Sequence, residues 1–153
     1  MNDKIGMVGV FETILRDKDG RVKAHETVRN GITTIGFDQA CALLGDAAVK
    51  IAYLGVGWGV GADGAFAVGQ TDLLGASKNR KGATYTHTPG TKTFTITASW
   101  GVNDPVAGTA DIGEIGTFWG ASGANMFSRL PRSSRLNKLA TDTLEIRWTL
   151  TLA

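Results

Sequence analysis

The stretch TLEIRWTLTL (residues 143–152) decides the fold class, because polar and apolar residues alternate through all of it. Successive side chains of a β-strand point to opposite faces, so this alternation predicts a strand with one buried and one solvated face. The residues expected on the buried face are Leu144, Ile146, Trp148, Leu150 and Leu152. Such a strand needs neighbouring strands and a core that covers its apolar face.

A second segment, residues 92–102, carries the same signal. Threonine and serine occupy one predicted face, which is typical of a solvated sheet surface. The residues expected on the opposite, core-facing side are Phe94, Ile96, Ala98, Trp100 and Val102. The sequence therefore predicts at least two long strands that contribute tryptophan to one core.

The turn sequence DKDG (residues 17–20) separates two further β-prone segments, residues 8–16 and 21–29. Asp-Gly is typical of hairpin turns, so these segments are expected to pair as an antiparallel hairpin with one wet face. Asn30 and Gly31 predict a second turn that ends this hairpin.

The remaining chain alternates between strand signals and polar or glycine-rich connections. Additional strands are predicted at residues 50–56, 111–119 and 126–130, and a basic loop is predicted at residues 77–82. Within 111–119, Gly113 and Gly116 indicate a bulge or a close backbone approach. Residues 133–141 are irregular and match no role.

One helix is expected, at about residues 35–44. Thr34 is placed to cap its N-terminus, and Gly45 supplies the residue type that commonly ends a helix. Phe37, Ala40, Cys41 and Leu44 fall at helical spacing and form a predicted apolar stripe.

Seven or eight strands in succession with one short helix argue against a parallel α/β sheet. We therefore expect a single mainly β domain over residues 1–153, an antiparallel β-sandwich that is jelly-roll-like.

The charge of +2 and the absence of an apolar run of about 18 residues lead us to expect neither a nucleic-acid nor a membrane partner. One cysteine allows no internal disulfide, and no apolar run follows the first residues, so no signal peptide is expected.

The glycine-rich run GVGWGVGADG (residues 55–64) contains the spelling G-x-G-x-x-G. A dinucleotide site needs a helix directly after these glycines and an acidic residue about twenty positions on, and neither is present. We interpret the run as a strand-to-strand loop and expect no cofactor. His25, His87 and Cys41 have no metal-ligand spacing, so neither a metal site nor a catalytic set is expected.

Four aromatic residues are candidates for a protein interface. Trp58 and Phe66 flank the glycine run, and we expect this loop to stay mobile until a protein partner orders it. Trp119 and Phe127 lie near GASG (residues 120–123) and fit an exposed contact pair as well as they fit the core.

The order of features along the chain resembles that of small β-rich virion proteins of tailed bacteriophages. The segments that carry the resemblance are the hairpin around DKDG, NGIT (30–33), LGVG (54–57), TDLL (71–74), EIGTF (114–118), MFSR (126–129) and DTLEIRWTL (142–150). This family includes capsid decoration (cement) proteins and tail or neck accessory proteins.

The resemblance implies a non-enzymatic protein of the virion, frequently a trimer, that binds the major capsid protein or tail and neck proteins. Capsid decoration is the favoured role within this class. The alternative from another class is a carbohydrate-binding β-sandwich module. The predicted core-facing registers of Trp100 and Trp148 count against a flat sugar platform.

Overall fold

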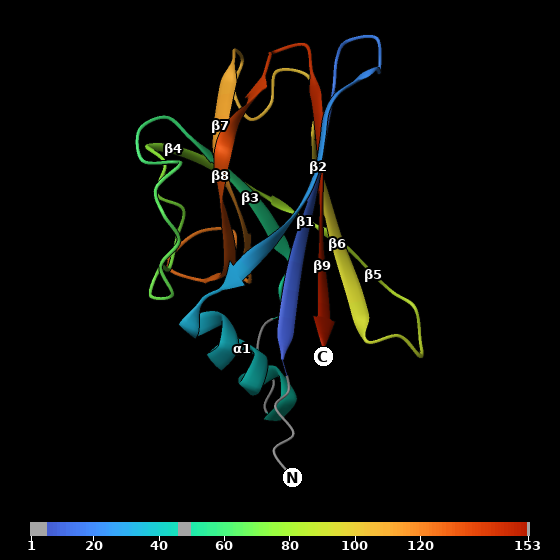
Figure 1. Cartoon of the computed structure of the whole chain (residues 1–153), viewed down its shortest axis with the longest axis vertical. Helices are drawn as coiled ribbons and strands as arrows, with labels where there is room; N and C mark the ends of the chain where they lie inside the picture. The colour runs from blue at the N-terminus through green and yellow to red at the C-terminus, as the bar shows by residue number, and fades with distance from the viewer. Residues whose placement is uncertain (1–5, 46–49, 153) are drawn as a thin grey trace.

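The computed structural model describes residues 6–45 and 50–152, which form nine strands and one helix (Figure 1). The elements are β1 (Met7–Arg16), β2 (Val22–Ile32), α1 (Thr34–Gly45), β3 (Tyr53–Trp58), β4 (Ser77–Gly82), β5 (Thr84–His87), β6 (Thr93–Trp100), β7 (Ala110–Phe118), β8 (Met126–Lys138) and β9 (Thr143–Leu152). The predictions of a mainly β fold and one short helix are confirmed.

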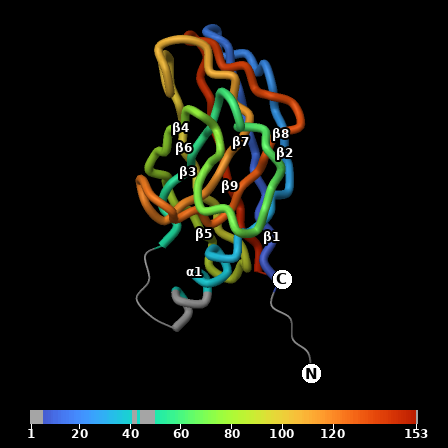
Figure 2. The backbone as a smooth tube through the Cα atoms, turned by 90° about the vertical axis from the view of Figure 1, so that its left-hand side faces the viewer, coloured from blue at the N-terminus to red at the C-terminus, as the bar shows by residue number. Residues whose placement is uncertain are grey.

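The strands form one antiparallel sheet in the order β4-β3-β7-β8-β2-β1-β9-β6-β5. This sheet curls until it nearly closes on itself, and the Trp100 indole of β6 donates a hydrogen bond to Asn79 Oδ1 of β4, near the opposite edge of the sheet, at 2.8 Å. The start of β1, the end of β9 and α1 lie at the same end of the molecule (Figures 1 and 2).

The core lies inside the curled sheet and follows the predicted alternation. Trp100 and Trp148 are fully buried, and the Trp148 ring packs edge-on against Phe94 and Phe127, with ring centres 5.8 and 5.7 Å apart. Two residues expected on the core face are instead exposed, Val102 to 57% and Leu152 to 46%. Leu152 is the last residue of its strand and Val102 lies beyond the end of β6, so the sheet does not cover them.

Helix α1 begins at Thr34 but is capped by Thr33, one residue earlier than predicted. The Thr33 hydroxyl accepts the Gly36 N–H at 3.0 Å and also bonds the Phe127 carbonyl, so the cap ties the helix to β8. Phe37, the first residue of the expected apolar stripe, is 47% exposed. The Cys41 and Leu44 side chains lie outside the described part of the structure.

Three connections differ from the prediction. Asn30 and Gly31 form no turn, because β2 continues through them and Gly31 pairs with Arg129 of β8. The predicted basic loop 77–82 is strand β4, which pairs with β3. The irregular segment that begins at residue 133 belongs to β8 as far as Lys138. The bulge or close approach predicted at Gly113 corresponds to a shift of the β7–β8 register at this residue, and the extra residues of the bulge belong to β8.

Candidate functional site

The glycine run divides between a strand and a loop. Its first four residues belong to β3, and the segment that we call the 59–76 loop connects β3 to β4. Gly57 lies against the Glu114 carboxylate of β7, and a Cβ at this position would be 2.2 Å from Glu114 Oε1. Gly59 and Gly61 have φ of +81° and +88°, a region that disfavours other residues. These glycines therefore serve close packing and turning of the chain.

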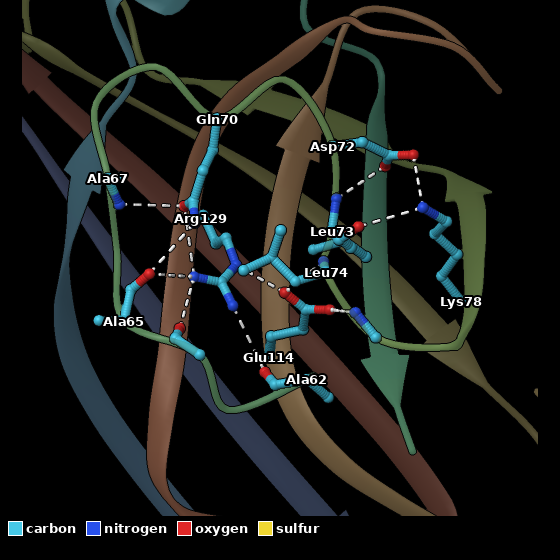
Figure 3. A network of polar contacts seen from close by, with 12 residues as sticks. Ala62, Ala65, Ala67, Gln70, Asp72, Leu73, Leu74, Lys78, Glu114 and Arg129 are labelled. Atoms are coloured by element: carbon cyan, nitrogen blue, oxygen red, sulfur yellow. Dashed lines mark hydrogen bonds and ion pairs between the residues drawn. The ribbon is translucent and has the colours of Figure 1, made fainter. Parts of the chain in front are cut away.

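A buried ion pair lies under the 59–76 loop (Figure 3). Arg129 of β8 and Glu114 of β7 are both fully buried, and Arg129 Nε lies 2.5 Å from Glu114 Oε2. The Glu114 carboxylate also accepts the backbone N–H groups of Gly75 at 2.6 Å and Leu74 at 3.1 Å. One carboxylate thus holds the end of the loop against the sheet.

The Arg129 guanidinium holds the first half of the same loop. Its Nη1 donates to the Gly64 carbonyl at 2.8 Å and to the Gln70 side-chain oxygen at 3.3 Å. Gln70 in turn accepts the Ala67 N–H and donates to the Ala65 carbonyl, both at 3.1 Å (Figure 3). Removing one member of a buried ion pair leaves an uncompensated charge, so the pair and the loop conformation depend on each other.

A second polar cluster holds the loop near Asp72. The Asp72 carboxylate receives Lys78 at 2.7 Å and Arg80 at 2.6 Å, both from β4. Burial raises the pKa of Asp72, but the hydrogen bonds from Lys78 and Arg80 outweigh it and hold that pKa below its ordinary value. Arg80 also stacks 3.7 Å over the Phe118 ring and bonds Asn125 Oδ1, which links this cluster to the loop after β7.

Although its backbone is held from within, the loop presents apolar side chains to solvent. Val60 is 85% exposed, Val68 61% and Leu74 45%. Phe37 of α1, also exposed, lies on the neighbouring element, because the Thr34 N–H bonds the Val68 carbonyl at 2.8 Å. A loop with a fixed backbone and exposed apolar side chains is suited to contact another surface.

The four predicted interface residues do not come together in one exposed group. Trp58 and Trp119 are partly buried and pack against the main core. Phe66 is partly buried, and its ring covers Gly31, where a Cβ would be 2.5 Å from a ring atom. Phe127 is 1% exposed and belongs to the core. An interface role for Trp58, Phe66 and Trp119 stays a prediction, and Phe127 takes the core alternative.

No sequence motif points directly to Arg129 and Glu114. Four basic residues fall within residues 129–138, as in a solvated segment, but Arg129 is fully buried and Lys138 is 1% exposed. Desolvation lowers the pKa of Lys138, whose ammonium donates to the carbonyls of Gly101 and Asp142. One indirect signal of a buried ion pair is present. The acidic Glu114 lies among apolar residues in one strand, and the basic Arg129 lies among apolar residues in the next strand.

Each of the two histidines forms a hydrogen bond with a residue of the neighbouring strand. His25 Nε2 lies 2.7 Å from Glu12 Oε1, and His87 Nδ1 lies 2.7 Å from the Thr93 carbonyl. Across residues 6–45 and 50–152, no three His, Cys, Asp or Glu side chains gather closely enough to hold a metal ion. The helix found in these ranges lacks the length and apolar character needed to cross a membrane.

Comparison with known proteins gives no family. Neither a family model, nor a curated protein, nor a solved structure matches this chain significantly.

Proposed function

We propose that this chain is a structural protein of a tailed-bacteriophage virion. Within this class the favoured role is that of a capsid decoration protein that binds the outer shell. The observation that carries the proposal is the 59–76 loop, whose backbone is held by the buried Arg129–Glu114 pair while Val60 and Val68 remain exposed. The order of sequence features that resembles small virion proteins supports the same role.

The mode of binding differs from the one expected from sequence. A glycine-rich loop was expected to become ordered on a partner, at a cost of about 1–2 kcal/mol of backbone entropy per residue. Here intramolecular hydrogen bonds from Arg129, Glu114 and Gln70 already hold the loop. A preformed contact loop loses less entropy on binding, which suits a protein that stays on a particle.

The proposal includes a finer description of the fold and the assembly. The curled sheet is taken as a jelly-roll-like sandwich whose halves meet across the core around Trp100 and Trp148. The protomers are taken to assemble as trimers on the major capsid protein, and native mass spectrometry of the purified protein tests this assembly. A carbohydrate-binding role gains no support from these tryptophans, because both are fully buried.

The protein composition of purified virions of the encoding phage tests the role. Quantitative mass spectrometry should find the chain at a copy number comparable to that of the major capsid protein. A small fixed number, as in the rings of a tail or neck, would move the role to a tail or neck accessory. Absence from purified virions would overturn the virion proposal.

The contact loop is tested by the double variant Val60→Asp, Val68→Asp. Both side chains are exposed, so the thermal midpoint should stay near that of wild type while binding to shells lacking the protein falls at least tenfold, because two charges would be desolvated. Val22→Asp on β2, 52% exposed and outside the loop, is the matched control. Equal binding by the double variant and the control would remove the loop from the interface.

A further inference from the structure

The seam between β2 and β8 is open over much of its length. In the described chain these strands pair at two positions, Gly31 with Arg129 and Ile32 with Ser128. Figure 1 shows β2 crossing from the central strands toward the lower end of β8. The earlier part of β2 pairs with β1 on its other side and forms no ladder pair with β8.

A bulge in β8 lies beside this seam. Residues 132–135 lie opposite the single residue Gly113 of β7, between regular pairs on either side. A bulge of this kind bends its strand and redirects side chains, and it is over-represented next to functional sites. Here it places Arg132 between β8 and β2.

The seam contains a pocket of about 230 Å³, lined by Glu26 and Val28 of β2 and by residues 130–134 of β8. Its walls combine apolar side chains with one arginine, one carboxylate and two serines. This volume is smaller than the roughly 300–1,000 Å³ typical of pockets for drug-sized ligands. It suits a ligand, or part of one, that is a few carbon atoms long.

Arg132 is the unusual residue of this pocket. Its side chain is 3% exposed, its Nη2 lies 2.7 Å from Glu26 Oε2, and its Nε donates to the Ser134 carbonyl at 3.1 Å. The remaining nitrogen, Nη1, is shielded from solvent and has no hydrogen-bond partner among the described residues. Buried polar groups nearly always have partners, so an unpaired guanidinium nitrogen needs an explanation.

We propose that this pocket binds a carboxylate and that Glu26 occupies the guanidinium until the ligand arrives. The Glu26 side chain is 42% exposed and contacts the guanidinium at Nη2, so it can turn toward solvent. In this proposal the departure of Glu26 uncovers the guanidinium, and the incoming carboxylate then takes Nη1 and Nη2 together, the planar two-bond arrangement that arginine favours. Val28, Leu130 and Pro131 cover the carbon atoms of the ligand.

This inference does not depend on the proposed function, because it requires only a carboxylate and the seam. The ligand is either a small free acid or an acidic side chain of another protein. Both offer the same chemistry to Arg132, and a pocket of this size accepts either.

The test is a titration of isotope-labelled protein with sodium propionate, followed by NMR at constant ionic strength. Saturable shifts are expected at the amides of Glu26, Val28 and residues 130–134. Glu26→Gln should tighten binding about tenfold, because it removes both the competing carboxylate and its repulsion. Arg132→Lys should abolish binding, because it keeps the charge and loses the planar pair of donors.

Glu12→Gln is the matched control, because Glu12 also pairs with an arginine, Arg147, but lines no part of the pocket. It should leave propionate binding unchanged. Parallel titrations with N-acetyl-glutamyl amide and inorganic phosphate separate the sources, and binding of the capped glutamate would support a protein side chain as ligand. Tighter binding of phosphate than propionate would overturn the assignment to a carboxylate. Absence of saturable shifts in both wild type and Glu26→Gln would overturn the site itself.

Discussion

At the scale of single residues, Arg129 and Glu114 do more than pair with each other. Each uses its remaining donors or acceptors on backbone groups of the 59–76 loop, so neither charge is left with unsatisfied atoms. A buried ion pair contributes little net stability when compared with apolar residues of similar size, but breaking one is costly. The pair is therefore better understood as a device that selects one loop conformation.

A double-mutant cycle tests this coupling. Arg129→Met and Glu114→Gln should each lower the free energy of unfolding by about 3–5 kcal/mol, because each leaves a buried charge unpaired. The double variant should lose clearly less than the sum of the two, as expected for residues in contact. Urea denaturation measures all three. Arg147→Met, which breaks an exposed pair with Glu12, is the control and should cost at most about 1 kcal/mol. Additive losses would contradict the coupling.

Asp72 gives the loop a pH dependence. Its pKa is lowered in the folded protein, so the ionised carboxylate stabilises the fold above the unfolded value of 3.8. This contribution is lost as the pH falls through the lowered folded pKa. Thermal midpoints should therefore be higher for wild type than for Asp72→Asn at pH 7, and the gap should narrow below about pH 4. A gap that stays constant down to pH 2 would show that ionisation of Asp72 does not matter.

At the scale of elements, the 59–76 loop is long and glycine-rich yet held at several points from within. The Leu74 and Gly75 amides bond the buried Glu114 carboxylate, whereas the hairpin tip around Gly90 is exposed. Local stability follows such buried contacts and varies across a structure. The loop should therefore behave as part of the sheet.

Hydrogen exchange measures this directly. In the free protein, the amides of Leu74 and Gly75 should exchange at least tenfold more slowly than the amide of Gly90, because a buried acceptor must be released first. Arg129→Met should remove much of this protection in the loop and leave β9 protected. Fast exchange at Leu74 and Gly75 in the free protein would instead favour the mobile loop expected from sequence.

The elements differ in how well sequence predicts them. β6 and β9 have one face on the core, so their alternation gave nearly correct bounds. β4 was missed because Ser77–Gly82 is an edge strand of polar residues with no apolar period. The predicted strand ends before Asn30, whereas β2 continues to Ile32. Asn30 and Gly31 are residues typical of a turn, and the pairing that keeps them in the strand involves β8, which is distant in the chain.

The candidate site was less predictable than the fold. The glycine run drew attention to the correct segment, but the residues that determine its conformation, Glu114 and Arg129, come from β7 and β8. Their pairing depends on a register that no local pattern encodes. Gly113 indicated an irregularity in the ladder, but that the extra residues are 132–135 of β8, and that they include the unpaired Arg132, is visible only when β7 and β8 are aligned.

At the scale of the whole molecule, the strands distant in the sheet order meet across the core. Trp148 of β9 packs against Phe127 of β8, and Trp100 of β6 reaches Asn79 of β4. β4 is one edge strand of the sheet and β6 is the second strand from the other edge, so the Trp100–Asn79 hydrogen bond joins strands that are far apart in the sheet order. Closure of this kind reduces the exposed strand edge that other chains could extend.

Asn79→Ala tests the closure. Trp100 is fully buried, so the variant leaves a buried indole N–H without its acceptor and should cost about 1–3 kcal/mol of unfolding free energy. Amide exchange in β4 should also become faster, because the strand loses its tie to β6. Asn30→Ala is the matched control, since it removes the acceptor of the buried Trp148 indole and lies on β2, in the middle of the sheet order. It should cost a similar amount in urea denaturation but leave exchange in β4 unchanged. Equal exchange in β4 for the two variants would mean that the curl of the sheet is maintained by the core alone, without this hydrogen bond.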